Sequence, residues 1–287
     1  MIKVLVTGKD SQLAQCLNYI KDCTDIAFTF KNSKELDITD NDSVSRNFEE
    51  SNYDYCVNCA AYTAVDLAEA ESEKARNINT IGVINLSVAC KKHKVSLIHI
   101  SSDFVFDGES TKPYSETDSK NPLGIYGKTK SEAEDKIAET LESYFIIRTS
   151  WLYSQHKSNF LKTMLNLSKT KKEISVVNDQ IGCPTNANDL AHLIIKIISS
   201  DLKFFGIYHF CNKGEASWFD FAEEIFRKWE IKVVVKPIKT SEYLTAAKRP
   251  KYSVLDTSKT EKIFNFNIKS WEDALDNFNL TQNKEYL

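Results

Sequence analysis

The stretch Asn121-Pro122-Leu123-Gly124-Ile125-Tyr126-Gly127-Lys128-Thr129-Lys130 decides how this chain folds, and residues 131–138 after it are good helix formers. Tyr126 and Lys130 are four residues apart, so on a helix they lie on one face and can meet. A nearby positive charge favours the phenolate and lowers the tyrosine pKa from its usual value of roughly 10. We therefore predict that Tyr126 is a proton donor whose pKa Lys130 lowers.

The position of this pair in the chain matters, because Tyr-x-x-x-Lys also occurs by chance on solvated helices. Upstream of it, a predicted strand ends in Ser101-Ser102, and a predicted strand at the N-terminus ends in Thr7-Gly8. The three features in this order resemble a short-chain dehydrogenase/reductase. That resemblance implies a catalytic triad of Ser102, Tyr126 and Lys130.

Composition excludes several classes of function. The chain has 287 residues, enough for one large domain or for a nucleotide domain with a smaller partner. A net charge of -3 argues against nucleic-acid binding. No stretch approaches the ~20 apolar residues of a membrane span, and the apolar start is too short for a signal peptide. The scattered cysteines and histidines lack metal-ligand spacing. We expect a cytoplasmic enzyme without a metal, a membrane partner or a nucleic-acid partner.

The N-terminal turn predicts a dinucleotide site with a damaged glycine signature. Residues 2–8 form a predicted strand and turn before a helix from Gln12, whose amides would face a pyrophosphate. Ser11 stands where backbone usually approaches phosphate. If the loop keeps its usual path, a left-handed serine there costs roughly 1–2 kcal/mol. Asp10 adds a negative charge. We expect cofactor binding that is weakened but not abolished.

The end of the second predicted strand bears on the choice of cofactor. An acidic residue there would bind the ribose 2′-hydroxyl and favour NAD. Residues 26–30 run instead into Lys31, and no acid occurs before Glu35. A lysine suits a 2′-phosphate, although an ordinary surface lysine is the alternative explanation. We predict NADPH as the cofactor, with NADH possible.

Alternating strand and helix patterns predict an α/β fold with a Rossmann-type doubly wound parallel sheet. After Trp151 the pattern loosens, which indicates a smaller mixed α/β C-terminal substrate lobe. We assign residues 1–150 to the dinucleotide-binding domain, with about 174–210 crossing back to it. The substrate-binding lobe then takes about 151–173 and 211–287.

Ordered motifs along nearly the whole chain resemble the dTDP-4-dehydrorhamnose reductase family of extended short-chain dehydrogenases/reductases. Besides the tyrosine motif, they are Asn58-Cys59-Ala60-Ala61-Tyr62-Thr63-Ala64-Val65-Asp66, Ser101-Ser102-Asp103-Phe104-Val105-Phe106-Asp107-Gly108, Arg148-Thr149-Ser150-Trp151-Leu152-Tyr153, Asp179-Gln180-Ile181-Gly182-Cys183-Pro184-Thr185, Gly206-Ile207-Tyr208-His209-Phe210 and Arg249-Pro250-Lys251-Tyr252-Ser253-Val254-Leu255-Asp256.

The resemblance implies two sets of binding residues. NADPH would contact the glycine loop through Gly8, Asp10, Ser11, Gln12 and Leu13. Its adenine would lie beside Asp37 and Ile38, and its inner ribose along Ala60, Ala61 and Tyr62. Tyr126 and Lys130 would also contact the cofactor. A nucleotide-sugar would meet Thr63, Val65, Ser102, Phe104, Tyr126, Trp151 and Arg249. Phe104 stands where the rhamnose-forming enzymes usually carry tyrosine. Some members bind magnesium at a dimer contact through glutamates, but Cys16 and about Asn188 occupy those places.

The implied reaction is NADPH-dependent reduction of the C4 keto group of a nucleoside-diphosphate 4-keto-6-deoxyhexose, in deoxysugar and surface polysaccharide biosynthesis. Tyr126 would protonate the alkoxide, and Ser102 would orient the carbonyl oxygen. Two alternatives stay open. One is an epimerase or dehydratase of the same superfamily that recycles its cofactor. The other is a non-catalytic NADP-binding regulatory protein, which the damaged glycine loop favours. A homodimer is possible.

Overall fold

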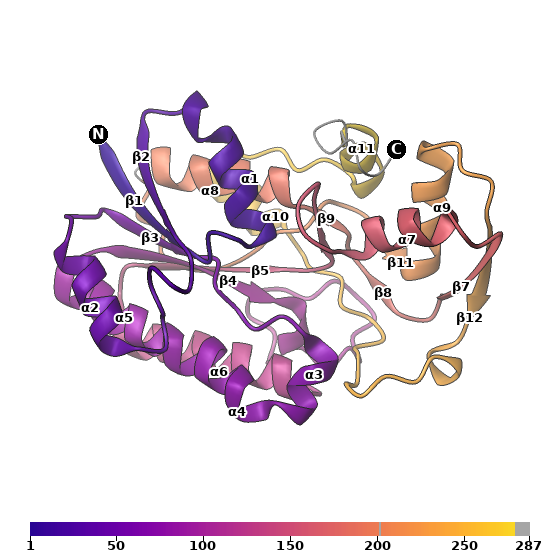
Figure 1. Cartoon of the computed structure of the whole chain (residues 1–287), viewed down its shortest axis with the longest axis horizontal. Coiled ribbons are helices and arrows are strands. Elements are labelled where there is room, and N and C mark those ends of the chain that lie inside the picture. The colour runs from indigo at the N-terminus through magenta and orange to yellow at the C-terminus, as the bar shows by residue number, and fades with distance from the viewer. Residues whose placement is uncertain (201, 279–287) are drawn as a thin grey trace.

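The computed structural model describes residues 1–200 and 202–278, and in this part of the chain it contains a six-stranded parallel sheet (Figure 1). The strands, in spatial order, are β2 (Ile26–Lys31), β1 (Ile2–Thr7), β3 (Tyr55–Asn58), β4 (Ser96–Ser102), β5 (Tyr144–Thr149) and β10 (Gly206–His209). The chain order reverses at β1, because β2 and β3 lie on its two sides. Doubly wound sheets bind ligands at the carboxyl ends of the strands beside such a point.

Helices cover both faces of this sheet (Figure 1). One face carries α1 (Gln12–Ile20), α8 (Ala187–Ser199) and α10 (Ser258–Phe264), and the other carries α2 (Asn41–Glu49), α5 (Gly82–His93) and α6 (Ile125–Thr140). Strand residues alternate between the two layers: Val4 and Val6 pack into the first core, and Leu5 packs into the second. The predicted Rossmann-type architecture is therefore confirmed.

Short helical elements lie in the connections between the strands and the longer helices. They are η1 (Lys21–Cys23), α3 (Val65–Ala70), α4 (Ser72–Arg76), η2 (Asn77–Ile81), which is a turn of π-helix, and η3 (Asp103–Val105). The π-helical turn carries Asn79. Its side chain accepts from the Tyr62 amide at 2.8 Å and donates to the Tyr62 carbonyl and to Thr129 Oγ1, both at 3.1 Å. This buried amide ties the loop after β3 to α6.

The rest of the chain builds a smaller lobe beside the sheet (Figure 1). Its elements are β6 (Leu152–Tyr153), α7 (Phe160–Ser168), β7 (Glu173–Val177), β8 (Ile181–Gly182), β9 (Thr185–Asn186), β11 (Ala216–Ser217), α9 (Trp218–Lys228), β12 (Val234–Ile238), η4 (Thr240–Glu242) and α11 (Trp271–Asp276). Tyr153, Phe221 and Trp271 meet in its apolar core. The lobe thus has a core of its own, separate from those under the sheet.

One part of the predicted division is wrong. The sequence assigns residues from about 174 onward to the first domain, but β7 pairs in parallel with β12 and so belongs to the smaller lobe. The chain returns to the sheet through α8, which packs against α1, and β10, which pairs with β5. Residues 279–287, also assigned to the lobe, lie outside the described residues. The remaining boundaries stay a prediction.

No helix in the described ranges is long and apolar enough to cross a membrane. All seven cysteines are free. Residues 1–200 and 202–278 contain no group of three histidine, cysteine or acidic side chains that could hold a metal ion.

A buried ion pair fixes α6 on the sheet. Arg148 on β5 donates to Glu134 on α6 through Nη2 at 2.7 Å and through Nε at 2.9 Å. Both residues are 1% exposed. Ser101 on β4 donates to the same carboxylate at 2.5 Å, and Lys120 lies 3.4 Å from it. One side chain of α6 is thereby bonded to two neighbouring strands.

Arg148→Met should lower the free energy of unfolding by about 3–5 kcal/mol, because Glu134 would keep a buried charge without its main partner. Denaturant titration followed by circular dichroism measures this. Arg76→Met is the control, since the Arg76–Glu132 pair is exposed and its loss should cost about 0–1 kcal/mol. Equal losses in the two variants would contradict the role assigned to the buried pair.

Candidate active site

The structure brings Ser102, Tyr126 and Lys130 together at the carboxyl edge of β4. Tyr126 and Lys130 lie on one face of α6, as their spacing predicts, and Ser102 is the last residue of β4. The Ser102 side chain is hydrogen-bonded to Tyr126. Lys130 Nζ donates to the carbonyl of Ile100, on the same strand, at 2.6 Å. The three residues therefore share one corner of the sheet, and their catalytic roles remain a prediction.

A glycine allows α6 to come this close. A Cβ on Gly127 would lie 2.2 Å from the carbonyl oxygen of Phe104. The Phe104 ring packs edge-on against Tyr126, with ring centroids 5.6 Å apart. The start of α6 is further held by Glu69, whose carboxylate accepts from the Ile125 amide at 2.8 Å. Tyr126 is thus placed by a close contact between the helix and η3.

Gly127→Ala should displace Tyr126 and destabilise the protein, because a methyl group cannot occupy the space beside the Phe104 carbonyl. We expect a loss of about 1–3 kcal/mol in unfolding free energy, typical of overpacking. Denaturant titration tests this. Lys128→Ala, at an exposed position in the same turn of α6, is the control and should leave the stability nearly unchanged. A Gly127→Ala variant as stable as wild type would contradict the packing argument.

The predicted lowering of the Tyr126 pKa is wrong in this structure. Burial raises the pKa of Tyr126 to about 12, the bond to Ser102 opposes this, and the nearby Asp103 carboxylate adds to it. Lys130 is not among the groups that shift this pKa, and its amine donates to the Ile100 carbonyl and lies 3.1 Å from His99 Nε2. A raised pKa keeps the phenol protonated at neutral pH, which is the form a proton donor needs.

Lys130 itself is shifted in the opposite direction. Burial lowers the pKa of Lys130 to about 8, and the negative charge of Glu134 on the same helix works against that shift. Its residue is 2% exposed. Burial therefore shifts both Tyr126 and Lys130 toward their uncharged forms, although a lysine with a pKa of about 8 is still mostly protonated at pH 7.

Asp103 lies at the same corner as the triad, although the sequence did not predict it as a site residue. It is 2% exposed, and its Oδ1 accepts from Ser102 Oγ at 3.0 Å. Its Oδ2 has no hydrogen-bond partner among the described residues. Burial raises the Asp103 pKa to about 6. The signal was available in the Ser101-Ser102-Asp103 sequence, since a carboxylate directly after a strand end falls on the ligand-binding edge.

The glycine loop differs from the expectation at Ser11. Ser11 has φ -71°, not a left-handed conformation, and its Oγ caps α1 by accepting from the Ala14 amide at 3.2 Å. The positive φ of the loop falls on Gly8, at 64°. A Cβ on Gly8 would also lie 2.6 Å from the Ala60 amide nitrogen. The strain predicted at Ser11 is absent because the turn places its left-handed residue three positions earlier.

These features fit a dinucleotide. The amides of Gln12 and Leu13 open α1 and have no backbone acceptor within the described part of the chain. They lie where β1 ends beside β3, so an anion could bind there. Gly8 and Ala60 meet there backbone to backbone, which leaves no side chain between the two strand ends. The Gln12 side chain points elsewhere, accepting from Ser154 at 2.8 Å on the smaller lobe.

The remaining predicted cofactor residues lie at the end of β2 or in the loops that follow β1, β2 and β3. Asp37 holds the turn before α2 by accepting from the Thr39 amide at 2.9 Å, and Ile38 is 4% exposed. Lys31 ends β2, next to Thr7 of β1, but its amine lies 3.5 Å from Glu50. Tyr62 donates to Glu71 at 2.9 Å. Asp10 and Ala61 lie in the loops after β1 and β3.

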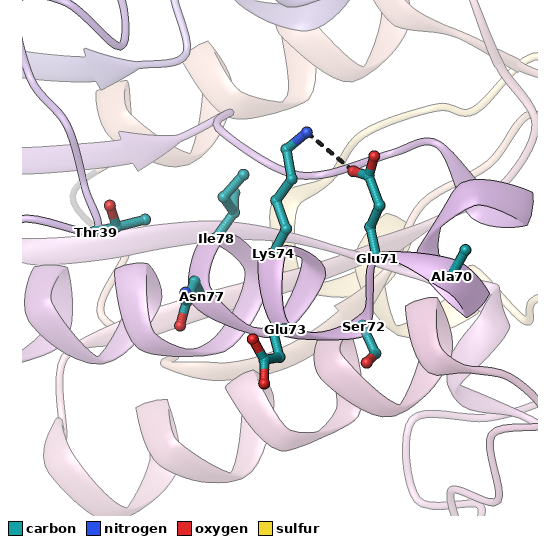
Figure 2. Close-up of a pocket in the computed structure, with 8 residues that line it drawn as sticks. All are labelled: Thr39, Ala70, Glu71, Ser72, Glu73, Lys74, Asn77 and Ile78. Atoms are coloured by element: carbon teal, nitrogen blue, oxygen red, sulfur yellow. Dashed lines mark hydrogen bonds and ion pairs between the residues drawn. The ribbon is translucent and has the colours of Figure 1, made fainter.

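A cavity of about 690 Å³ opens beside the adenine-side residues (Figure 2). Thr39, which follows Ile38, lines one end, and Glu71, just before α4, forms an ion pair at 2.9 Å with Lys74 of α4 over the cavity. No member of the triad lines this cavity. The cavity therefore adjoins the loop that carries Asp37 and Ile38, which are predicted to lie beside the adenine.

The predicted substrate residues come from both lobes. Thr63 and Val65 lie in the loop and first turn of α3. Trp151 has a positive φ of 45° and stacks on Trp218 with ring centroids 3.5 Å apart. A Cβ on Gly182 would lie 2.7 Å from the Trp151 ring, so glycine leaves room for the indole. Sequence reasoning missed Trp218, because only the folded lobe brings α9 against the loop after β5.

Arg249 is held by a partner that the sequence did not predict. Its guanidinium binds Asp66 of α3 at 2.7 Å and 3.0 Å, and Asp66 also accepts from the Ala247 amide. The Arg249 bond holds the pKa of Asp66 below its usual value. The predicted contact of Arg249 with substrate is untested. Its observed role is to tie the smaller lobe to the helix that follows Thr63.

A family model described as the RmlD substrate binding domain matches residues 2–283. The chain belongs to this family. Among curated relatives, it is 38% identical to a dTDP-4-dehydrorhamnose reductase of Aggregatibacter actinomycetemcomitans, over 96% of this chain and 98% of that protein. It is 40% identical to the spore coat polysaccharide biosynthesis protein SpsK of Bacillus subtilis, over 96% of each chain.

Solved structures agree with membership of the RmlD family. A dTDP-4-dehydrorhamnose reductase from Clostridium acetobutylicum superposes with a TM-score of 0.93 at 40% identity, covering 96% of this chain and 98% of that one. The Bacillus anthracis enzyme, solved in complex with NADP, gives 0.91 at 39% identity, covering 97% and 98%. A UDP-glucose 4-epimerase from Brucella ovis gives 0.83 at 17% identity over 98% of each chain, a likeness of fold alone.

Proposed function

We propose that this protein is an NADPH-dependent reductase that acts on the C4 keto group of a nucleoside-diphosphate 4-keto-6-deoxyhexose, as a dTDP-4-dehydrorhamnose reductase does. The observation that carries the proposal is a phenol, Tyr126, kept protonated by burial and hydrogen-bonded to Ser102 at the ligand-binding edge of the sheet. Relatives of similar length with this activity support it, and the structural neighbour from Bacillus anthracis was solved with NADP. Deoxysugar and surface polysaccharide biosynthesis would be the setting, with a cytoplasmic location.

The protein's own residues would supply positioning and a proton. Ser102 orients the carbonyl oxygen of the substrate, and Tyr126 donates its proton to that oxygen as it becomes an alkoxide. General-acid help of this kind is typically worth ~10²–10⁴ in rate. Gln12 and Leu13 would bind the pyrophosphate through their amides, and Lys130 would bind the nicotinamide ribose. When bound, the nicotinamide supplies the hydride.

Net consumption of NADPH separates this function from the two alternatives. An epimerase or dehydratase recycles its cofactor, and a regulatory protein binds it without turnover. The experiment is to incubate the purified protein with keto-sugar nucleotides and NADPH, follow the loss of absorbance at the reduced nicotinamide band, and identify the product by NMR. No NADPH loss with any keto-sugar nucleotide would contradict the reductase.

A homodimer remains a prediction that light scattering can test.

Tyr126→Phe should lower turnover by orders of magnitude, because it keeps the ring and removes the donated proton. The dissociation constant for NADPH should stay within a few-fold of the wild-type value. Steady-state kinetics and calorimetry measure the two quantities. Tyr243→Phe, at a tyrosine that is 59% exposed, is the matched control and should leave both unchanged. Near wild-type reduction by Tyr126→Phe would mean that another group is the acid.

Ser11→Gly should leave NADPH affinity within about threefold, because Ser11 is unstrained and glycine is nearly as good a helix cap. Gly8→Ala is the contrasting variant. Its methyl group would meet the Ala60 backbone at a positive φ, so binding should be lost. Calorimetry at fixed salt tests both. A tenfold tightening in Ser11→Gly would restore the idea of a strained serine, and no NADPH binding by wild type at millimolar concentration would favour the regulatory protein.

A further inference from the structure

A row of four buried polar side chains crosses the sheet and ends at Lys130. Thr7 of β1 donates to Asn58 Oδ1 of β3 at 2.6 Å, and Asn58 Nδ2 lies 3.1 Å from His99 Nδ1 of β4. His99 Nε2 in turn lies 3.1 Å from Lys130 Nζ. Each of the four residues is 0–2% exposed. Water is excluded from such a row, so every hydrogen bond in it must have a donor and an acceptor.

The Ala60 backbone sets the direction of this row. Its N–H can only donate, and it lies 3.1 Å from Asn58 Oδ1 and 3.4 Å from Thr7 Oγ1, so its shorter hydrogen bond is to the Asn58 amide. The oxygen of the Asn58 amide is therefore the atom that faces Thr7 and Ala60, and the NH₂ group faces His99. An amide NH₂ has donors and no acceptor, so His99 Nδ1 must accept.

The direction at Asn58 decides the tautomer of His99. Burial holds the pKa of His99 well below its usual value, and a charge on Lys130, when present, lowers it further, so the imidazole is neutral in either state of Lys130 and carries one proton. With Nδ1 accepting, that proton is on Nε2. An N–H then faces Lys130 Nζ, and only an uncharged amine has a lone pair to receive it.

We propose that the row Thr7–Asn58–His99 favours the uncharged amine of Lys130 in the cofactor-free protein, which makes His99 a positioning residue for the triad. The amine accepts from His99 and donates to the Ile100 carbonyl at 2.6 Å. Protonation of Lys130 would force the His99 proton from Nε2 to Nδ1 and break the bond to Asn58. The charge of Lys130 and the tautomer of His99 are therefore coupled.

The charged groups around Lys130 allow this. Glu134, from the same helix, favours the ammonium form, but its carboxylate is neutralised by Arg148 of β5 at 2.7 Å. The other titratable groups at this corner are Tyr126 on α6, a phenol with a raised pKa, and Asp103 after β4, whose pKa burial raises to about 6. The lowered pKa of Lys130, about 8, agrees with the direction set by the hydrogen bonds.

Nitrogen NMR on the cofactor-free protein with labelled histidines tests the proposal without turnover. At pH 9, above the Lys130 pKa, His99 should carry its proton on Nε2. His209 is the internal control, with the opposite tautomer. Its Nε2 faces the Arg148 guanidinium at 3.3 Å and its Nδ1 faces the Tyr114 carbonyl at 3.0 Å, so its proton belongs on Nδ1. A His99 proton on Nδ1 at pH 9 would overturn the proposal.

Two variants of His99 separate positioning from simple packing. Glutamine can accept from Asn58 and still donate an N–H to Lys130, whereas leucine can do neither. The Lys130 amine is followed by NMR of labelled lysine, with its signal assigned by its loss in Lys130→Met. His99→Leu should raise the Lys130 titration by about one pH unit, and His99→Gln should leave it within a few tenths. Equal shifts in both variants, or none in His99→Leu, would overturn the proposal.

The inference rests on the proposed function only in taking Lys130 as a member of the triad. Its test measures protons in the resting protein, and the test of the proposed function measures NADPH consumption. If His99 and His209 have opposite tautomers but the protein reduces no keto-sugar, the proton assignment is supported and the reductase function is contradicted. Reduction by a protein whose His99 carries its proton on Nδ1 would do the reverse.

Discussion

The buried pair between Glu134 and Arg148 is the interaction on which the site depends. Tyr126, Lys130 and Glu134 repeat every four residues, so they form one stripe along the buried face of α6. The Glu134 carboxylate is bonded to Arg148 of β5 and Ser101 of β4, so a rotation of the helix would leave a buried charge without its partners. The pair therefore fixes which way Tyr126 and Lys130 point, and both reach the strand that ends in Ser102.

Local patterns predicted the parts of this arrangement that depend on short-range geometry. The four-residue spacing placed Tyr126 and Lys130 on one helical face, and alternating strand and helix patterns predicted the parallel sheet. The row that ends at Lys130 was beyond such patterns. Thr7 and Asn58 are 51 residues apart and Asn58 and His99 are 41 apart, and they meet only because β1, β3 and β4 are neighbours in the sheet. Strand order is a property of the whole fold, not of any motif.

The two wrong predictions at the site share a physical cause. Each assigned an energetic effect to a residue type without knowing its surroundings. Ser11 was expected to be strained if the loop kept its usual path, but the turn closes at Gly8 and leaves Ser11 free to cap α1. Lys130 was expected to lower the Tyr126 pKa, but its amine is held by Ile100 and His99 while burial acts on the phenol. Burial raises the pKa of Tyr126, and the same burial disfavours the Lys130 charge that could have lowered it.

The opposite shifts of Tyr126 and Lys130 bear on the direction of the reaction. Reduction of a carbonyl consumes a proton, so its catalyst must begin with a protonated acid, whereas oxidation of the alcohol would begin with a phenolate. A site that raises the Tyr126 pKa to about 12 and lowers the Lys130 pKa to about 8 stabilises the phenolate less than solvent would, so the phenol stays protonated at neutral pH. The proton that reduction consumes is therefore already present on Tyr126 in the resting protein. The buried row from Thr7 to His99 contributes to this by offering Lys130 a donor where an ammonium ion would need an acceptor.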